Sequence, residues 1–247
     1  MKNILTVQNL CKNQIIKDVS FSIEEGEMVA VMGPSGSGKS TLLYNVSGMD
    51  TADAGSVILD GSEVTHMSED EKAKLRLENM GFVFQQMNVL SNLNVIDNIM
   101  FPALHSKTCK LSKLQIRERA IQLMRDFSIE ELAKREVTEV SGGQLQRVCI
   151  CRSLMLEPQI LFADEPTGAL NQSAAAEVID AFLQINMQGT TILMVTHDSK
   201  VAGKCDRILY ILDGQLQGEL KLSKYREDCN TADRERKVNE WLEEKGW

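Results

Sequence analysis

The sequence predicts an α/β fold, because short apolar segments typical of strands alternate with segments of helical character. Residues 28–32 and 160–163 contain no charged side chain, which is typical of strands buried on both faces of a parallel sheet. A glycine-rich loop at 33–41 joins the first of these strands to a helix-like segment. The chain has 247 residues, enough for one large α/β unit or two small domains.

Further strands are expected on both sides of these segments, at 4–7, 19–23, 55–59, 81–84, 191–195, 207–212 and 215–220. Gly26 lies where the chain must reverse before the strand at 28–32. Two Asp-Gly pairs, at 60–61 and 213–214, are hairpin signals, because both residues tolerate the left-handed backbone of a tight turn. We therefore expect antiparallel pairs beside a parallel sheet.

Helices are expected where capping residues precede an apolar periodicity. Ser68 and Glu71 predict a helix over about 69–79, and a second helix should run from about 173 to 187. Ser112 and Gln115 begin a segment with one apolar stripe typical of core, formed by Ile116, Ala120, Leu123, Met124 and Phe127. A helix that starts at Ser141 should end near Glu157, because Pro158 disfavours helical geometry in the residue before it.

Composition limits the possible partners and location. Apolar residues make up 43% and charged residues 25% of a chain with a formal charge of −8, so the protein is globular, and nucleic acid is not expected as its main partner. No run of 18 apolar residues and no signal peptide is seen, so we expect a cytoplasmic protein. The six cysteines are scattered, which favours buried thiols over a metal site or disulfides.

The loop at 33–41 fits the pattern G-x-x-x-x-G-K-[ST], in which backbone N–H groups at a helix N-terminus surround phosphates. Its lysine adds a positive charge near the outer phosphates, and the serine hydroxyl after it can bind Mg²⁺. The alternative is a turn that only reverses the chain. The expected nucleotide-binding residues are Gly33, Pro34, Ser35, Gly36, Ser37, Gly38, Lys39, Ser40 and Thr41.

Acidic residues and a histidine follow two other expected strands. Asp164 and Glu165 end the strand at 160–163, which suits an aspartate linked to Mg²⁺ followed by a base that polarises water, although acidic pairs are also common in turns. His197 follows the strand at 191–195. A lone histidine is more often structural, yet ligands bind at the carboxyl edge of parallel strands.

The segment Ser141, Gly142, Gly143 and Gln144 has the form of a capping box, so it could be only a helix start. Two glycines in the first turn lower helix propensity, but they let backbone N–H groups approach an anion. With this segment the chain resembles the ATP-binding-cassette (ABC) ATPases, whose signature sequence it matches. The resemblance covers roughly residues 3–220.

The resemblance implies a P-loop NTPase (RecA-like) core with an antiparallel β subdomain and an inserted α-helical subdomain. The core would comprise 1–86 and 159–220, and the helical subdomain about 87–158. The charged tail at 221–247 would form a short amphipathic helix around Val238, Trp241 and Leu242. Docking of that helix on its own domain is favoured over a contact with a partner.

The resemblance also implies a role for each residue that matches a family motif. Gln85 would be the lid glutamine that senses Mg²⁺ and the attacking water, Asp164 the carboxylate of the outer Mg²⁺ sphere, and Glu165 the general base. His197 would contact the γ-phosphate. Ser141–Gln144 would bind the γ-phosphate of ATP held by the opposite subunit, which implies a homodimer with ATP and Mg²⁺ as cofactors.

Within the family, the segments 81–90, 162–170 and 194–198 are similar to the lipoprotein-release and macrolide-export group, and more narrowly to bacitracin- and lantibiotic-resistance ATPases of Gram-positive bacteria. This implies a separate membrane permease, contacted near 85–102, that keeps the ATPase at the inner face of the membrane. The expected role is therefore in antimicrobial peptide resistance or export.

Other functions remain open at this stage. They are a lipoprotein-release or cell-division-type membrane machine, a soluble cassette ATPase in DNA repair or translation, and a regulatory module that binds ATP without hydrolysis. The soluble classes are opposed by the lack of sustained heptads between Gly38 and Ser141 and by the single acidic cassette. The regulatory module is opposed by the presence of both Glu165 and His197.

Three positions depart from the family pattern. The region at 10–15 lacks the aromatic residue that usually stacks on adenine, so selectivity for ATP over GTP should be loose. Asn171 stands where an aspartate is usual, which should weaken coupling between the two sites of a dimer. Val140 replaces a leucine, a smaller apolar change that should be harmless.

Overall fold

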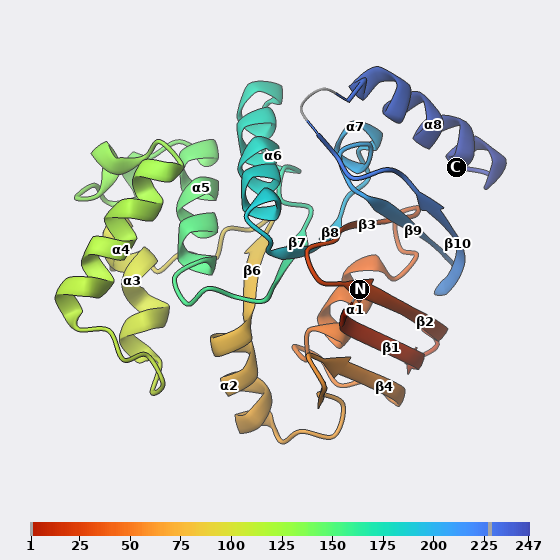
Figure 1. The fold of residues 1–247 in the computed structure, drawn as a ribbon, viewed down its shortest axis with the longest axis horizontal. Helices are drawn as coiled ribbons and strands as arrows, with labels where there is room; N and C mark the ends of the chain where they lie inside the picture. Colours follow the sequence, from red (N-terminus) through yellow and green to blue (C-terminus); the bar gives the residue numbers. More distant parts are fainter. Residues whose placement is uncertain (1, 227–228) are drawn as a thin grey trace. The chain divides into compact units, whose positions relative to one another are not determined.

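The computed structural model describes residues 2–226 and 229–247 (Figure 1). The chain divides into two compact units. Unit 1 contains the chain up to Lys72 together with Asn186–Trp247, and unit 2 is Ala73–Ile185. The boundaries fall inside two helices, α2 (Glu69–Asn79) and α6 (Gln172–Met187). Across the described ranges, no helix is both long and apolar enough to cross a membrane.

An antiparallel sheet forms one part of unit 1. Its strands are β1 (Asn3–Lys12), β2 (Ile16–Glu24), β4 (Ala54–Leu59) and β5 (Ser62–Glu63), in the order β2-β1-β4-β5. The turn between β4 and β5 has φ angles of 45° at Asp60 and 78° at Gly61, as the Asp-Gly signal predicts. The strands expected at 4–7 and 19–23 are confirmed but longer, because pairing along β1 extends to both ends.

The second sheet of unit 1 contains β3 (Met28–Met32), β8 (Thr191–Val195), β9 (Arg207–Leu212) and β10 (Gln215–Lys221). β3 lies between β8 and β9 and is parallel to both, whereas β10 forms a hairpin with β9 through Asp213 and Gly214. Every residue of β3 and β8 is buried, as their apolar sequences predict. The helix α1 (Lys39–Val46) packs against β8.

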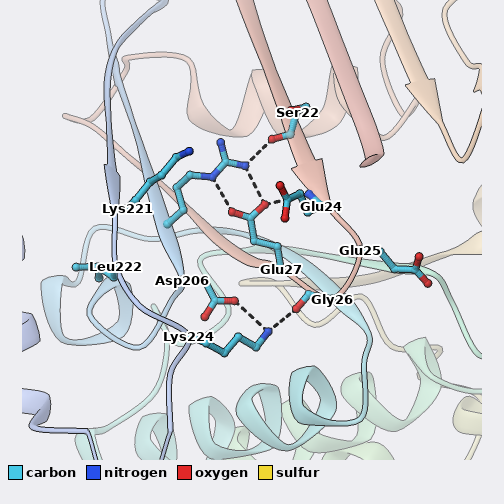
Figure 2. A pocket seen from close by; sticks show the side chains of 10 residues that line it. Ser22, Glu24, Glu25, Gly26, Glu27, Asp206, Lys221, Leu222 and Lys224 are labelled. Atoms are coloured by element: carbon cyan, nitrogen blue, oxygen red, sulfur yellow. Dashed lines mark hydrogen bonds and ion pairs between the residues drawn. The ribbon is translucent and has the colours of Figure 1, made fainter. Parts of the chain in front are cut away.

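Charged residues cluster where β3 begins, at the end of the strand that is distant from the glycine-rich loop. Arg207 forms ion pairs with Glu27 and Glu219, at 2.7 and 2.9 Å. Burial acts to lower the pKa of Arg207, but hydrogen bonds and charge from the two glutamates outweigh it and raise that pKa. Lys224 lies between the Asp206 carboxylate and the Gly26 carbonyl oxygen beside a cavity of about 310 Å³ (Figure 2).

The C-terminal segment of unit 1 docks on its own unit. Helix α8 (Thr231–Glu244) packs against the short helix α7 (Ser199–Ala202) (Figure 1). Val238 and Leu242 of α8 are buried. Trp241 and Trp247 both meet the ring of Tyr210 edge-on, with centroids 6.0 and 6.1 Å away. The amphipathic helix expected from the spacing of its apolar residues is therefore confirmed, as is docking on the same domain.

Unit 2 contains a parallel pair of strands and a group of helices. The strands are β6 (Met80–Phe84) and β7 (Ile160–Asp164). The helices between them are α3 (Val95–His105), α4 (Lys113–Asp126) and α5 (Gly142–Ser153), with short 3-10 turns at Glu130–Leu132 and Val137–Glu139. α3 packs against α4 and α5, and α5 packs against β6 (Figure 1).

Most local predictions for unit 2 are confirmed. Ser112 and Gln115 form the expected capping box at the start of α4, and the stripe that follows is buried apart from Leu123, which is half-buried. α5 is different, because it ends at Ser153 and not near Glu157. Glu157 adopts a left-handed φ of 53°, and the Arg119 guanidinium accounts for the early end, because it donates to the carbonyl oxygens of Leu154 and Met155.

Candidate functional site

The loop after β3 has a backbone that only glycine adopts without strain. A Cβ on Gly33, whose φ is 151°, would lie 2.0 Å from the Ile211 carbonyl oxygen. Gly36 and Gly38 also have positive φ, at 79° and 100°, and a Cβ on Gly36 would meet open space. The pattern of glycines therefore fixes a loop that wraps back on itself and keeps its backbone accessible at Gly36.

The loop ends at the N-terminus of α1, where Gly38 is the N-cap and no side chain caps the helix. Lys39 extends back over the loop, and its Nζ donates to the carbonyl oxygens of Gly33 and Pro34 at 2.7 and 2.9 Å. Ser40 and Thr41, both half-buried, lie in the first turn of α1. A helix N-terminus without a capping side chain, next to a lysine, suits an anion such as phosphate.

His197 lies near this loop along the same sheet edge. Val31 pairs with Val195 in the adjacent parallel strands β3 and β8, so Gly33 and His197 each stand two residues beyond a paired position. The Thr196 N–H donates to the Val31 carbonyl oxygen at 3.2 Å, which continues the pairing. The His197 side chain is exposed. The structure thus brings two of the predicted elements of unit 1 to one edge.

In unit 2 the same geometry brings together Gln85 and Glu165. Phe84 pairs with Asp164 at the end of the parallel strands β6 and β7, so Gln85 and Glu165 both follow directly. The Asp164 side chain is buried, and Glu165 has a left-handed φ of 47°, which is rare for a residue with a Cβ. Such local strain persists where the surrounding structure fixes it and is concentrated at functional sites.

The Gln85 side chain rests on a glycine of the loop that follows Glu165. A Cβ on Gly168 would lie 2.9 Å from Gln85 Nε2. The loop itself is held by the Gly168 N–H, which donates to the Glu165 carbonyl oxygen at 3.0 Å. Gly168 is not among the site residues predicted from the sequence. Its position three residues after Glu165 was the available signal.

Ser141 and Gln144 form a true capping box at the start of α5, with Ser141 Oγ accepting from the Gln144 N–H and Gln144 Oε1 from the Ser141 N–H. The two glycines between them allow close packing. A Cβ on Gly143 would lie 2.7 Å from Ala174 Cβ in α6, and one on Gly142 would lie 3.4 Å from Leu170. This packing role adds to the backbone exposure that the sequence predicts.

The structure shows what surrounds two of the positions that depart from the family pattern, Asn171 and the region at 10–15. Asn171 caps α6, because its Oδ1 accepts from the Ala174 N–H at 2.9 Å. In the region at 10–15, a left-handed turn at Asn13 and Gln14 places Ile15 beside Gly38, with Ile15 44% exposed. The apolar surface next to the start of α1 is therefore aliphatic.

One buried residue near the predicted site residues was missed altogether. Gln146 in α5 has no exposed surface, and its Nε2 donates to the carbonyl oxygens of Phe84 and Pro166. The signal was its spacing of three and four residues from the apolar residues Cys149 and Ile150, which places a polar amide on the buried face of the helix.

Among residues 2–226 and 229–247, no group of three or more His, Cys, Asp or Glu side chains could hold a metal ion. All six cysteines are free thiols, and Cys149, Cys151 and Cys205 are buried.

Comparison with known proteins gives a consistent result. Residues 16–168 match the family model described as ABC transporter. The macrolide export ATP-binding/permease protein MacB of Campylobacter jejuni is 40% identical over 242 residues, 95% of this chain but 37% of that protein. The bacitracin export ATP-binding protein BceA of Halalkalibacterium halodurans is 39% identical over 212 residues, 85% of this chain and 83% of that protein. The chain thus spans about a third of the length of the macrolide relatives.

Solved structures of ABC transporter cassettes are also similar to this chain. The dimeric ABC transporter cassette MJ0796 superimposes with a TM-score of 0.82 at 35% identity, over 90% of this chain and 100% of that one. A post-hydrolysis state of the same cassette bound to ADP and Pi gives a TM-score of 0.81 at 34% identity. The predicted α/β fold with an NTPase core is therefore confirmed.

Proposed function

Because the chain belongs to the ABC transporter family and is an ATP-binding cassette ATPase, we propose that it hydrolyses ATP with Mg²⁺ to power a separate membrane permease. The proposal rests on the conformation of the loop at 33–41. Its glycines hold a backbone that opens toward an uncapped helix N-terminus, and Lys39 lies over it.

The residues of unit 1 are assigned to phosphate binding. Backbone N–H groups of the loop and the N-terminus of α1 would surround the phosphates, and Lys39 would exchange its carbonyl partners for phosphate oxygens. Ser40 would contribute its hydroxyl to Mg²⁺, with Asp164 and Gln85 as the other protein groups around the ion. Bound Mg²⁺ would neutralise charge on the phosphates. His197 would donate a hydrogen bond to the γ-phosphate.

Glu165 is assigned as the general base. Its carboxylate would accept a proton from a water molecule as the water oxygen attacks the γ-phosphorus and the bond to the ADP oxygen breaks. The left-handed backbone at Glu165 supports this assignment, because strained backbone conformations are concentrated at functional sites. Gln85 would orient the same water.

We further propose that two copies of the chain form the active assembly. Ser141, Gly142, Gly143 and Gln144 would bind the γ-phosphate of ATP held by the second copy, since they lie at a helix N-terminus. The dimeric state of the cassette MJ0796 supports a homodimer.

The domain division and the partner complete the proposal. One ATPase domain would have its core at 1–86 and 159–220 and a helical subdomain at about 87–158, which would contact the permease near 85–102. The ATPase would then be peripheral at the inner face of the membrane. The bacitracin and macrolide export relatives support antimicrobial peptide resistance or export as its role.

Nucleotide binding and turnover of purified variants test the ATPase assignment. Lys39→Ala should lose ATP binding, because the lysine is the cation at the phosphates, whereas Glu165→Gln should bind ATP but not turn it over. ATP binding by Lys39→Ala at wild-type affinity would contradict the placement of the phosphates.

Co-purification tests the partner. The tagged chain, extracted with detergent from native membranes, should retain a polytopic membrane protein that is encoded as a separate polypeptide. Recovery of only water-soluble partners under the same conditions would contradict the proposed permease.

A further inference from the structure

We propose that Gln146 is a positioning residue that holds Gln85 and Glu165 in a fixed relation to each other, an inference that rests on the hydrolytic function proposed above. Gln146 lies in the second turn of α5 and has no exposed surface. Its Nε2 donates to the carbonyl oxygen of Phe84 at 3.1 Å and to that of Pro166 at 2.8 Å. Phe84 directly precedes Gln85, and Pro166 directly follows Glu165.

The orientation of the amide is determined by its neighbours. Both contacts are backbone carbonyl oxygens, which only accept hydrogen bonds, so the NH₂ group of Gln146 must face them. Its Oε1 is buried and has no hydrogen-bond partner within the described residues. An unpaired buried oxygen is unfavourable, and the two hydrogen bonds that the nitrogen donates offset that cost.

These two hydrogen bonds lie just beyond the end of the pairing between β6 and β7. The parallel pairing of β6 and β7 ends at Phe84 and Asp164. Beyond that point the chain carries the left-handed Glu165, and then Pro166, which has no N–H to donate. The Gln146 amide joins the two diverging segments where a ladder hydrogen bond would otherwise be needed.

The Gln85 side chain depends on this relation. It rests on Gly168, where a Cβ would lie 2.9 Å from Gln85 Nε2, so the contact is already close. Gly168 is attached to Glu165 through its N–H donated to the Glu165 carbonyl oxygen. A shift of the loop at 165–168 relative to β6 would therefore move Gln85 and the carboxylate of Glu165 apart.

Helix α5 also anchors the chain after Gln85. The Arg152 guanidinium donates to the carbonyl oxygens of Met87 and Asn88, and the Cys149 thiol contacts that of Met87 at 3.1 Å. Gln146 binds the residue before Gln85 and also reaches the loop of Glu165. Because the signature at 141–144 begins the same helix, one rigid element supports the signature, Gln85 and Glu165.

Replacement of the amide by a thioether of similar volume isolates the two hydrogen bonds. Gln146→Met should keep the KM for ATP within about threefold and lower kcat about 10- to 100-fold, the range expected when catalytic groups are misplaced by a fraction of an ångström to 1 Å. Ile150→Val, a buried change in the same helix, is the control and should leave kcat within about twofold.

A double-mutant cycle with Gln85→Ala separates positioning from simple destabilisation. If Gln146 acts through Gln85, the combined variant should lose clearly less kcat than the product of the two single losses, because residues that act as a unit are not additive. Losses that multiply would overturn the proposal. If Gln146→Met does not fold, Gln146→Glu, which keeps the shape but presents a carboxylate to both carbonyls, should show the same loss of kcat at pH 8.

The kinetics of the variants also separate the role of Gln146 from the proposed hydrolysis of ATP. Suppose that the wild type hydrolyses ATP and Glu165→Gln does not. If Gln146→Met then turns over ATP within about twofold of the wild type, only the role of Gln146 is overturned. A wild type that binds but never hydrolyses ATP would overturn both.

Discussion

Arg234 anchors the C-terminal helix to unit 1, and its replacement tests the energetic account of that docking. Its guanidinium is almost completely buried and donates to the carbonyl oxygens of Gly203, Cys205 and Ser223 at 2.6, 2.8 and 2.8 Å. It also lies over the Tyr225 ring, 5.5 Å from the centroid. Gly203 and Cys205 follow α7, so one side chain joins α8 to the segment after His197.

Arg234→Met keeps much of the apolar stem of the side chain but removes every donor. If each of the three carbonyl oxygens, of which those of Gly203 and Cys205 are buried, loses its partner at about 1 kcal/mol, the free energy of unfolding should fall by about 3 kcal/mol. For a chain of this size that corresponds to a decrease in Tm of about 6–12 °C. Arg236→Met is the matched control, because Arg236 lies in the same helix but is exposed, with ion pairs to Asp233 and Glu240. Its loss should stay below about 0.5 kcal/mol.

The two tryptophans of the chain provide the assay. Trp241 and Trp247 both belong to the C-terminal segment and pack on Tyr210, so intrinsic fluorescence reports undocking of α8. In urea, the fluorescence midpoint of Arg234→Met should fall well below those of wild type and Arg236→Met. Equal midpoints for the two variants would refute the idea that the buried hydrogen bonds of Arg234 hold α8 in place.

Two further predictions follow from the packing of unit 1 and from the thiols. Gly33→Ala should lower ATP affinity by at least about tenfold in a fluorescent-nucleotide assay, because the new Cβ would collide with the Ile211 carbonyl oxygen and displace the loop; wild-type affinity would show that the loop tolerates a side chain. Burial raises the pKa of the Cys149, Cys151 and Cys205 thiols, so at pH 8 they should resist iodoacetamide in the folded protein and react after denaturation, as mass spectrometry of the labelled peptides would show. Rapid native labelling at these positions would contradict their burial. Faster labelling is expected at the half-buried cysteines Cys11, Cys109 and Cys229.

Local signals predicted most strands and helix starts, because each depends on neighbouring residues. The Asp-Gly pair at 213–214 gives the β9–β10 hairpin, and Ser112 caps α4 as the sequence indicates. The end of α5 was placed too late, because it depends on Arg119, which lies more than thirty residues away in sequence. A contact of that kind leaves no local pattern.

The candidate site shows the same division between local and long-range information. The loop at 33–41 was predicted from residue types alone, since each glycine meets a backbone requirement within the loop or at its edge. Gln146 and Gly168 were missed, because their importance arises from pairing of β6 with β7 and from the position of α5. Gly143 was assigned to anion binding, and its packing against Ala174 became apparent only in three dimensions.

Two copies of this chain are proposed to bind ATP, and Glu165 is proposed to act as the base in its hydrolysis. Sedimentation of the Glu165→Gln protein with Mg²⁺ and ATP, together with a phosphate-release assay, tests both proposals. The proposal predicts a stable ATP-bound dimer with no measurable phosphate release, and a monomer with ADP. Phosphate release near the wild-type rate, or a monomer at saturating ATP, would contradict it.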